Sequence, residues 1–410
     1  LRHYLRQTIF LKRISLIPMK RICYGLLFLT VLLFSACKDE AETDERVFLE
    51  KEQAFERNFG GAAEDIACSI VEKDGFLYSF GLSKSFGEPN GDHYLVKTDL
   101  QGNLIWEKTH GGAAKEEGYR IKKSADGNLF LLGVTESSGN GATDVHLLKV
   151  DIEGNVLWES VVGGSNRDSP ATLVEKASGE IIIAGNTESY GNGSADIYLV
   201  WIDASGTFIR QKTHGESLLD GSSDLLELAT GELMLFGYTN NYGTASRDFY
   251  LLKMTSLGDS IWSKRYGGNA SYEEAHQLLQ TANGNFLLHG HTSKTDPNHN
   301  MYSVLVDSAG NTIWEREFGG NQHDGGQAAI INSAGNFVLL DRSMSFGNQR
   351  QLLFVELTQK GNLIQQQQIG SAKNERADDI IEANNSYYIA GHSDNFGSGD
   401  NDVYLIKKLK

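Results

Sequence analysis

The chain contains 410 residues, of which 53 are acidic and 37 basic, and its formal net charge at pH 7 is −16. So acidic a chain is a poor candidate for binding nucleic acid or an anionic membrane surface, because like charges repel. Its three cysteines are also too few for a disulfide framework in a chain of this length, so the fold has to be stabilised by packing.

The N-terminal segment has the features of a secretory signal. Basic side chains precede an unbroken apolar run from Gly25 to Ala36, which is too short to span a bilayer as a stable helix. Met19 is the expected start, because Met-Lys-Arg-Ile begins a normal signal. The run Leu-Phe-Ser-Ala-Cys37 resembles the lipoprotein box of bacteria, which implies cleavage before Cys37 and its acylation, for example with palmitate. We therefore predict a signal peptide over residues 1–36.

Residues 37–53 are predicted to form a flexible tether that follows the lipidated cysteine. They are acidic and poor in aromatic side chains, so they cannot bury enough apolar surface to fold. Lys38-Asp39-Glu40, directly after Cys37, resembles the export signal with which some Gram-negative bacteria move lipoproteins to the outer surface. The resemblance implies an outer-membrane lipoprotein at the cell surface, held to the membrane by its lipid. The alternative is a plain linker without an address.

A glycine doublet recurs through the rest of the chain at intervals of 51 or 52 residues and marks seven repeat units. The markers are Gly60-Gly61, Gly111-Gly112, Gly163-Gly164, Gly215-Glu216, Gly267-Gly268, Gly319-Gly320 and Gly370-Ser371. Each unit contains four short strand-like runs and no run with the 3.6-residue period of a helix. Such units are typical of β-propeller blades. We therefore predict an all-β fold, a seven-bladed β-propeller of four-stranded antiparallel blades.

The first unit shows how a blade is built. From the ring axis outward, its expected strands are Asp65–Glu72, Phe76–Leu82, His93–Thr98 and Leu104–Thr109. The third and fourth strands are joined by a turn in which Asp99 bonds the backbone ahead of it and Gly102 takes a positive φ. The same aspartate returns in three other units, where we also expect a structural role: Asp151, Asp203 and Asp307.

A large apolar side chain follows this turn in six units and is expected to pack one blade against the next. These anchors are Trp106, Trp158, Phe208 or Ile209, Trp262, Trp314 and Ile364. Trp201 differs, because it stands where other units carry a lysine, and we expect it to be an exposed contact. Cys68 lies in a strand-like run and is expected to be a small buried side chain.

The two ends of the repeat array complement each other. The seventh unit stops at Leu409 after its third strand, and residues 54–59 form an orphan strand ahead of the first unit. If this N-terminal strand supplies the outer strand of the last blade, the ring closes and two open sheet edges disappear. We therefore predict a monomeric propeller over residues 54–410, closed by its N-terminal strand.

The repeats carry a family resemblance that covers residues 55–410. The spacing Asp99-x-x-Gly102-x-x-x-Trp106 is similar to the tryptophan-docking motif of quinoprotein (PQQ-like) propeller repeats. The whole unit also resembles the repeats of secreted and surface propeller proteins of bacteria. These motifs are specific to the fold and not to an activity. No cofactor-binding set accompanies them, so we expect no quinone.

Acidic and aromatic side chains recur on two kinds of loop that share one face of a propeller. An acid opens the first strand of each unit: Asp65, Glu116, Asp168, Asp220, Glu273, Asp324 and Glu375. A second acid opens the third strand of five units: Asp92, Asp144, Asp196, Asp248 and Asp402. The aromatic residues are Phe86, Tyr190, Tyr242, Phe346 and Phe396. These residues predict a face that binds a carbohydrate or Ca²⁺. The alternative is that each acid accepts hydrogen bonds from loop N–H groups and holds neighbouring blades together.

Catalysis needs an asymmetric set of side chains, and the fifth unit departs most visibly from the repeat. That unit holds His289, His291, Asp296 and His299. His289 and His291 share one face of a strand, so a metal pair is an alternative. His291 and His392 occupy the same repeat position, however, which favours a packing role.

The preferred function is therefore not enzymatic. We expect a surface lipoprotein whose propeller face binds a glycan or another envelope protein. One alternative is a periplasmic scaffold in outer-membrane assembly, which the PQQ-like resemblance implies. Another is a polysaccharide hydrolase or lyase built on a propeller.

Overall fold

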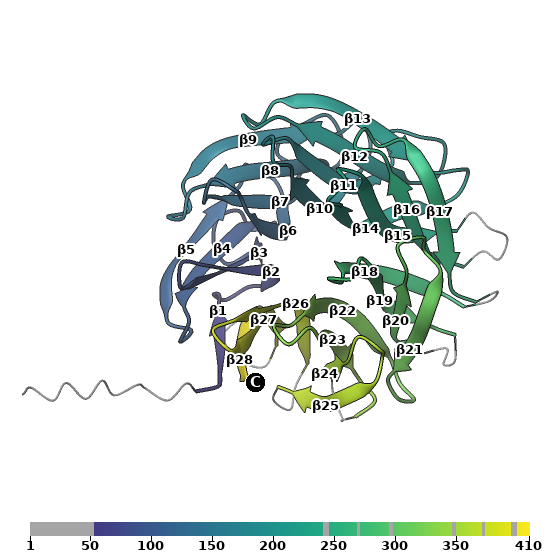
Figure 1. The fold of residues 1–410 in the computed structure, drawn as a ribbon. Helices are drawn as coiled ribbons and strands as arrows, with labels where there is room; N and C mark the ends of the chain where they lie inside the picture. Colours follow the sequence, from purple (N-terminus) through teal and green to yellow (C-terminus); the bar gives the residue numbers. More distant parts are fainter. Residues whose placement is uncertain are drawn as a thin grey trace, which may run out of the picture. The chain divides into compact units, whose positions relative to one another are not determined.

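The computed structural model describes residues 53–240, 246–268, 271–294, 298–346, 350–370, 374–394 and 400–410. The predicted signal peptide, Cys37 and most of the tether lie outside these residues, as do Tyr242, Asp296 and Phe396. Within the described residues, 28 strands form seven four-stranded antiparallel sheets. The sheets stand in a ring (Figure 1), which confirms the seven-bladed β-propeller. This part of the chain contains no helix that is long and apolar enough to cross a membrane.

Each blade is a meander of four strands that follow one another from the ring axis outward. The first blade consists of β2 (Asp65–Lys73), β3 (Phe76–Ser83), β4 (Asp92–Asp99) and β5 (Leu104–His110). The second consists of β6 (Glu116–Lys123), β7 (Leu129–Thr135), β8 (Asp144–Val150) and β9 (Val156–Val162). The third consists of β10 (Asp168–Glu175), β11 (Ile181–Thr187), β12 (Asp196–Ile202) and β13 (Phe208–His214). The fourth consists of β14 (Asp220–Glu227), β15 (Leu233–Thr239), β16 (Asp248–Met254) and β17 (Ser260–Tyr266).

The remaining three blades follow the same order. The fifth consists of β18 (Glu273–Gln280), β19 (Phe286–Thr292), β20 (Asn300–Val306) and β21 (Thr312–Phe318). The sixth consists of β22 (Asp324–Ile331), β23 (Phe337–Ser343), β24 (Gln351–Leu357) and β25 (Leu363–Ile369). The seventh consists of β26 (Glu375–Ala383), β27 (Ser386–Ser393), β28 (Asp402–Leu409) and, as its outer strand, β1 (Phe55–Phe59).

Strand β1 closes the ring, as predicted. It pairs antiparallel with β28, from Phe55 opposite Lys407 to Phe59 opposite Val403. In Figure 1 the first strand of the propeller therefore lies beside the last one. The pairing covers the outer edge of β28, which would otherwise expose a row of unpaired backbone groups.

The turn between the third and fourth strands has the predicted chemistry. In the first blade, Asp99 Oδ1 accepts hydrogen bonds from the N–H groups of Gln101 and Asn103 over 2.9 and 2.8 Å. Gly102 has a φ of 78°, which a residue with a side chain rarely adopts. The observed strands of this blade differ from the predicted bounds by no more than one residue at either end.

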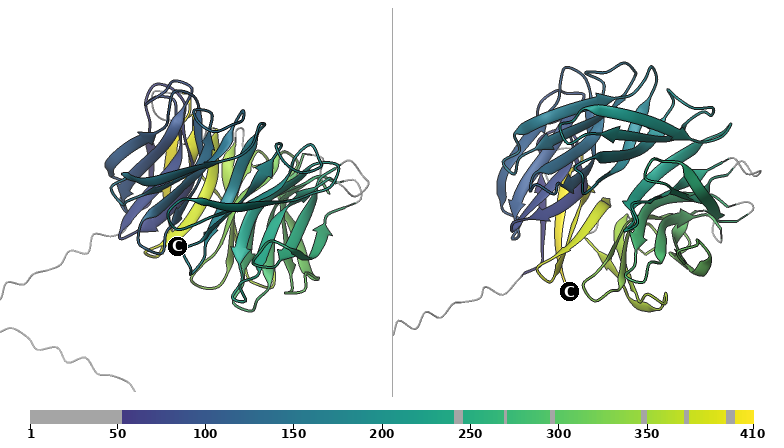
Figure 2. Two further views of the ribbon diagram at one scale, coloured as in Figure 1. Left: turned by 90° about the horizontal axis from the view of Figure 1, so that it is seen from above. Right: turned by 45° about the horizontal axis from the view of Figure 1, so that its top comes forward.

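The strand directions give the ring two distinct faces (Figure 2). All inner strands begin at one face, which also carries the links between blades and the loops between second and third strands. We call it the loop face. The outer strands begin at the opposite face, beside the tight turns, and we call it the turn face. The two kinds of loop meet on the loop face as predicted, since the Ala63 N–H donates to Ser85 Oγ over 2.9 Å.

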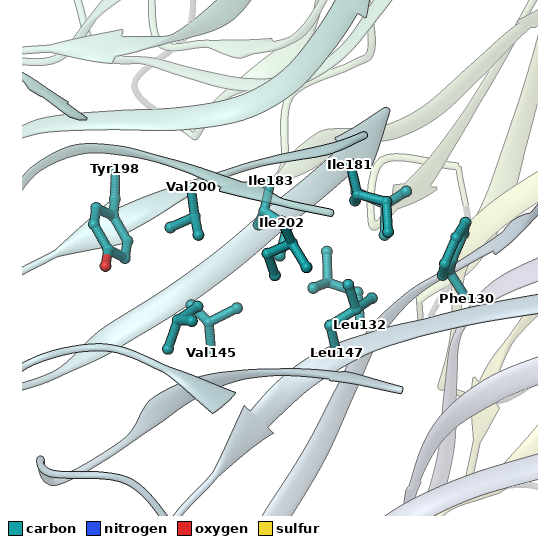
Figure 3. Packing of buried hydrophobic residues seen from close by; sticks show 11 residues of the cluster. Phe130, Leu132, Val145, Leu147, Ile181, Ile183, Tyr198, Val200 and Ile202 are labelled. Carbon is teal, nitrogen blue, oxygen red and sulfur yellow. The ribbon is translucent and has the colours of Figure 1, made fainter. Parts of the chain in front are cut away.

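The core is divided among the contacts between blades. Seven hydrophobic clusters lie in the described residues, one at each contact between neighbouring blades. Figure 3 shows the cluster between the second and third blades, to which the second blade contributes Leu132 and Leu147 and the third blade Ile183 and Val200. Burying one such side chain contributes about 1.5–3 kcal/mol. The ring is therefore held together by the same kind of interface repeated around its axis.

The four predicted tryptophan anchors have the expected role. Trp314 is 8% exposed, and the other three are partly buried against clusters between blades: Trp106, Trp158 and Trp262. The prediction is wrong for Phe208, Ile209 and Ile364, which are 47–48% exposed. These three side chains lie one or two residues before the strand position that the tryptophans occupy in other blades, which we call the tryptophan register.

The third blade exchanges the two members of a stacked pair. Arg210 occupies the tryptophan register opposite Trp201, and its guanidinium lies 3.7 Å over the Trp201 ring. In the first blade, Lys97 lies over Trp106 in the reverse arrangement. Trp201 is therefore fully buried, and the expectation of an exposed contact is wrong. The cation–π contact is therefore kept in the third blade, with the cation on the outer strand and the aromatic ring on the third strand.

Candidate functional site

The twelve predicted carboxylates occupy the positions expected from the repeat, but they are buried. None is more than 7% exposed in the set Asp65, Glu116, Asp168, Asp220, Glu273, Asp324, Glu375, Asp92, Asp144, Asp196, Asp248 and Asp402. They stand at the first residues of the inner and third strands, beneath the loop face. These positions consequently do not form an exposed acidic surface.

Their hydrogen bonds match the structural alternative. Glu116 Oε2 accepts from the N–H of Gly112 over 3.0 Å, and Asp92 Oδ2 accepts from the N–H of Glu88 over 3.1 Å. A Cβ atom on Gly111 would lie 2.1 Å from an oxygen of Asp92 and 2.5 Å from one of Glu116, so both carboxylates crowd this link between blades. Burial and the neighbouring Glu116 raise the pKa of Asp92. The paired acids thus connect neighbouring blades, and a role in ligand binding stays a prediction.

The predicted aromatic residues fold the loops onto the propeller. The Tyr190 ring stacks on Tyr198 with centroids 5.7 Å apart, and its hydroxyl donates to the carbonyl of Gly163 over 2.9 Å. Phe86 packs on Tyr94 in the same way, at 5.7 Å. Tyr190 and Phe346 remain 36% and 42% exposed. Their contact with a carbohydrate stays a prediction.

A β-bulge in every inner strand shapes the centre of the ring. In each blade the pairing of the first two strands skips one residue. The skipped residues are Cys68, Tyr119, Ala171, Ser223, His276, Gln327 and Asp378. All seven line a cavity of about 390 Å³. A bulge leaves its residue without a partner in the sheet. The sheet therefore does not restrict which side chain stands at that position, and the side chain can contact a ligand.

Cys68 is therefore not simply a buried packing residue. It is partly exposed and lines this cavity, although burial raises the pKa of its thiol. The seven bulged side chains differ in size and charge, whereas the residues around them repeat. The cavity is consequently asymmetric despite the repeated scaffold.

A second, adjoining cavity of about 560 Å³ concentrates this asymmetry in the last three blades. Its lining is polar and aromatic: Tyr272, Glu274, His276, His291, His299, His323, Gln327, Arg342 and Arg376. We call this cavity the axial pocket. The pair Glu274 and His291 has Ile66 and Leu82 as its equivalents in the first blade. Titratable side chains in the fifth blade thus occupy the positions at which the first blade has apolar side chains.

Tyr272 and Glu274 form the best-defined polar contact of the axial pocket. The Tyr272 hydroxyl donates to Glu274 Oε2 over 2.8 Å, and Arg247 lies 3.5 Å from the same carboxylate. The Arg247 guanidinium is also 5.3 Å from the centroid of the Tyr272 ring. Burial and the hydrogen bond to Glu274 raise the pKa of Tyr272. The phenol is therefore protonated at neutral pH and can act as a proton donor.

Four histidines lie next to one another in the axial pocket. The His291 ring is 5.1 Å from His299 and 5.4 Å from His276, and His299 stacks on His323 at 5.3 Å. Burial, reinforced by the neighbouring imidazoles and Arg342, lowers the pKa of His291 to about 3. Burial also lowers the pKa of His276 well below its ordinary value. Both rings are neutral at neutral pH.

Two arginines complete the pocket and differ in their partners. Arg376 Nε lies 2.8 Å from Asp378 Oδ1, and the other oxygen of Asp378 is 3.3 Å from His392 Nδ1. Arg342 Nε is buried and has no hydrogen-bond partner among the described residues. Burial and the nearby Arg376 lower the pKa of Arg342, which remains charged at neutral pH. A buried donor without a partner favours an anionic ligand.

The histidines singled out in the sequence have different fates. His291 and His299 line the axial pocket, and His392 lines the adjoining cavity, so their shared register does not mean burial in the core. His289 is fully buried and bonds Ser303 Oγ over 2.9 Å, so it takes no part in the pocket. The described residues contain no group of three or more His, Cys, Asp or Glu side chains suited to hold a metal ion.

Sequence reasoning missed most of the axial pocket. Tyr272, Arg342 and Arg376 do not stand out as candidates, because none of them belongs to a recognisable catalytic motif. Besides the histidines of the fifth unit, the sequence offers one signal, a register that varies from blade to blade: Arg342 stands where the other blades carry Leu82, Val134, Asn186, Tyr238, His291 and His392.

The fold and the axial pocket define a seven-bladed β-propeller with one asymmetric pocket rich in histidine and arginine. No protein-family model matches the chain. Among curated proteins, the regulatory protein FlaEY of Caulobacter vibrioides is 21% identical over 166 residues, and the match covers 35% of this chain. The match spans 17% of that protein's own length.

Solved structures of propeller enzymes are similar in fold. A PL25 ulvan lyase has a TM-score of 0.57 and 11% identity, and the match covers 85% of this chain and 95% of the lyase. A second polysaccharide lyase has a TM-score of 0.52 and 10% identity, with 86% and 91% covered. A puromycin hydrolase has a TM-score of 0.53 and 13% identity, with 82% of this chain and 51% of the hydrolase covered. At such identities the likeness shows the propeller fold alone.

Proposed function

We propose that this propeller binds an acidic polysaccharide in the axial pocket and cleaves it by β-elimination. One observation carries the proposal: a protonated phenol, neutral imidazoles and a guanidinium with an unpartnered Nε line the same cavity of about 560 Å³. Two of the structural neighbours are polysaccharide lyases, which supports the same class of substrate.

The axial pocket contains the three groups that an elimination on a uronate requires. A cation must hold the carboxylate, a base must remove the proton from the adjacent carbon, and an acid must protonate the leaving oxygen. We assign Arg342, His291 and Tyr272 to these roles in that order. The C–O bond between two sugars breaks with its electron pair on the leaving oxygen, and a C=C bond forms in the uronate. Protons and electrons balance without a further reactant.

Tyr272→Phe tests the proton donor. It removes the hydroxyl and keeps the ring, so we expect kcat on a cleavable uronate polysaccharide to fall by about 10²–10⁴-fold with little change in KM. The rate is measured from the ultraviolet absorbance of unsaturated uronate ends. Tyr266→Phe is the matched control, because its hydroxyl bonds Gly310 at an outer strand, away from the pocket. If the wild-type protein forms no unsaturated ends on any of the uronate polysaccharides tested, the proposal is wrong.

Arg342→Gln tests recognition of the carboxylate. Because the substrate carboxylate would lose its cationic partner, we expect KM to rise about tenfold or more, and the salt dependence of binding to weaken. Arg316→Gln removes the same charge from an outer strand, where Arg316 bonds the carbonyl of Gly361, and should leave KM unchanged. Equal effects of the two substitutions on KM would rule out a specific role of Arg342.

Binding without cleavage is the second candidate, and one contact favours it. The Tyr272 hydroxyl already donates to Glu274, so it serves a leaving oxygen only after that bond is released. Calorimetric titration with uronate oligosaccharides that gives saturable heat but no unsaturated products would assign the chain to glycan-binding proteins.

We also propose that the protein is an outer-membrane lipoprotein anchored through Cys37 at the cell surface. The apolar run before Cys37 and the Lys38-Asp39-Glu40 sequence after it support this address. Mass spectrometry of the mature N-terminal peptide tests the acylation. Cleavage of the propeller by protease added to whole cells tests the outward orientation, and its protection would favour a periplasmic scaffold.

A further inference from the structure

The outer strands carry a second set of β-bulges with a common side chain. In six blades the pairing of the third and fourth strands skips the second residue of the outer strand. The skipped residue is aliphatic in all six cases and is 45–51% exposed: Ile105, Leu157, Ile209, Ile261, Ile313 and Ile364. We call these six residues the aliphatic ring.

Neither the sheet nor the core explains the aliphatic ring. Single exposed aliphatic residues are ordinary, but these recur at one register around the molecule. The residue just before each of them is less uniform, since Leu104, Val156, Phe208 and Leu363 are apolar and exposed whereas Ser260 and Thr312 are polar. A bulged residue makes no cross-strand pair, and these side chains point to solvent and not into a cluster. The repeated choice of Ile or Leu therefore indicates a contact outside the propeller.

The aliphatic ring lies on the same face as the entry of the chain. All outer strands begin at the turn face, and in the seventh blade the outer strand is β1. Ala54, the residue before β1, takes the position that the aliphatic ring occupies elsewhere. If residues 37–53 form the predicted flexible tether, their end-to-end distance would be roughly 20–25 Å, and somewhat more where like charges extend it. A lipid on Cys37 would thus keep the turn face close to a bilayer.

We propose that the aliphatic ring rests on the lipid surface in which Cys37 is anchored, so that the loop face and the axial pocket point away from the membrane. The inference rests on the proposed lipid anchor and is independent of the pocket's activity. Apolar side chains gain free energy at the boundary between headgroups and acyl chains. With a net charge of −16 the chain has no general electrostatic attraction to anionic lipid, so the apolar contact suits zwitterionic headgroups.

The test compares two positions of the second blade in the full acylated protein, reconstituted in phosphatidylcholine vesicles. A fluorophore is placed at Leu157→Cys in the aliphatic ring or at Ser138→Cys in an exposed loop of the loop face, each with Cys68→Ser. Lipids that carry a quencher on the acyl chain are then added. We expect quenching at residue 157 to exceed that at residue 138 at least threefold. Equal quenching at both positions overturns the proposal, because the propeller would then tumble freely on its tether.

A second variant tests the aliphatic side chains themselves. Ile105→Ser combined with Ile209→Ser and Ile313→Ser should abolish the difference in quenching and leave the melting temperature unchanged, because all three side chains are exposed. A difference that persists in this variant contradicts the role of the ring. If the ring instead pairs two copies of the chain, sedimentation gives a dimer and no quenching occurs, which also contradicts the proposal. An unmodified Cys37, seen by mass spectrometry, contradicts the anchor and the docking together.

Discussion

Asp341 breaks the repeat inside the wall of the propeller. Its equivalents in the six other blades are Gly81, Gly133, Gly185, Gly237, Gly290 and Gly391. Asp341 is fully buried, and neither carboxylate oxygen has a hydrogen-bond partner among the described residues. Burial and the nearby Asp324 raise its pKa well above the ordinary value. It precedes Arg342 in β23, so a destabilising residue stands directly beside the axial pocket, as is common at functional sites.

Asp341→Gly is expected to stabilise the protein. Removing a buried carboxyl group without hydrogen-bond partners should raise the free energy of unfolding at pH 7 by about 1–3 kcal/mol. Because the folded pKa lies above the unfolded value of about 3.9, the cost of Asp341 grows as the pH rises through and beyond that value. The gain should therefore be larger at pH 7 than at pH 4. Urea unfolding at both pH values measures it, and a variant less stable than wild type at pH 7 would refute the account.

At the scale of elements, β1 is the closure on which the ring depends. Deleting residues 53–59 removes the partner of β28 and the packing of Phe55 and Phe59, which is worth roughly 3–6 kcal/mol. We expect a lower melting temperature and the loss of a single cooperative transition, followed by calorimetry. Deletion of residues 38–52, which lie before β1, is the matched control and should leave the transition intact. A chain without β1 that melts like wild type would contradict closure.

The elements themselves could be predicted closely, because glycine doublets, Asp-Gly turns and alternating apolar residues all repeat with one period. These copies of the same signal locate each strand of the first blade to about one residue, and Ala54 to Phe59 stood out as the missing strand. The bulges could not be predicted in this way. A skipped residue changes neither the period nor the apolar pattern, so nothing in the sequence shows that His276 and Asp378 turn toward the ring axis.

The face predicted from the sequence and the axial pocket differ for a related reason. Repeated acids such as Asp65 and Glu116 attract notice, but repetition is what a structural role at each link between blades produces. Residue type alone also does not reveal burial, which here turns carboxylates into acceptors for backbone N–H groups. The axial pocket instead consists of departures from the repeat, such as Tyr272 and Arg342. Their proximity depends on blades five and six meeting at the axis, which only the closed ring brings about.

At the scale of the whole molecule, the two faces of the ring carry different chemistry. The axial pocket is built from the first residues of inner strands and from links at the loop face, whereas the aliphatic ring stands at the turn face. The strands that separate the two faces are the most regular part of the chain. The repeat therefore acts as a spacer between the axial pocket, whose residues differ from blade to blade, and the aliphatic ring, which recurs in six blades.

Acid should destabilise the whole propeller through its buried histidines. Burial lowers the pKa of several described histidines, most strongly those of His93, His276, His289 and His291. A group with a depressed folded pKa contributes stability that is complete above the unfolded value of about 6.5 and is lost as the pH falls toward the folded value. For His289, whose pKa is lowered to about 3, the loss amounts to about 1.4 kcal/mol per pH unit below 6.5.

Buried acids with a raised pKa, such as Asp92, Glu273 and Asp341, act in the opposite sense, because their cost falls as they take up protons, but they are fewer than the buried histidines. The free energy of unfolding should therefore fall steadily from pH 7 to pH 5. His289→Asn retains a hydrogen-bonding side chain beside Ser303 but cannot titrate, so it should flatten the slope by about 1.4 kcal/mol per pH unit. Urea unfolding at pH 7, 6 and 5 measures both slopes. A wild-type stability that is flat over this range, or an unchanged slope in the variant, would show that these histidines are not buried in the neutral form.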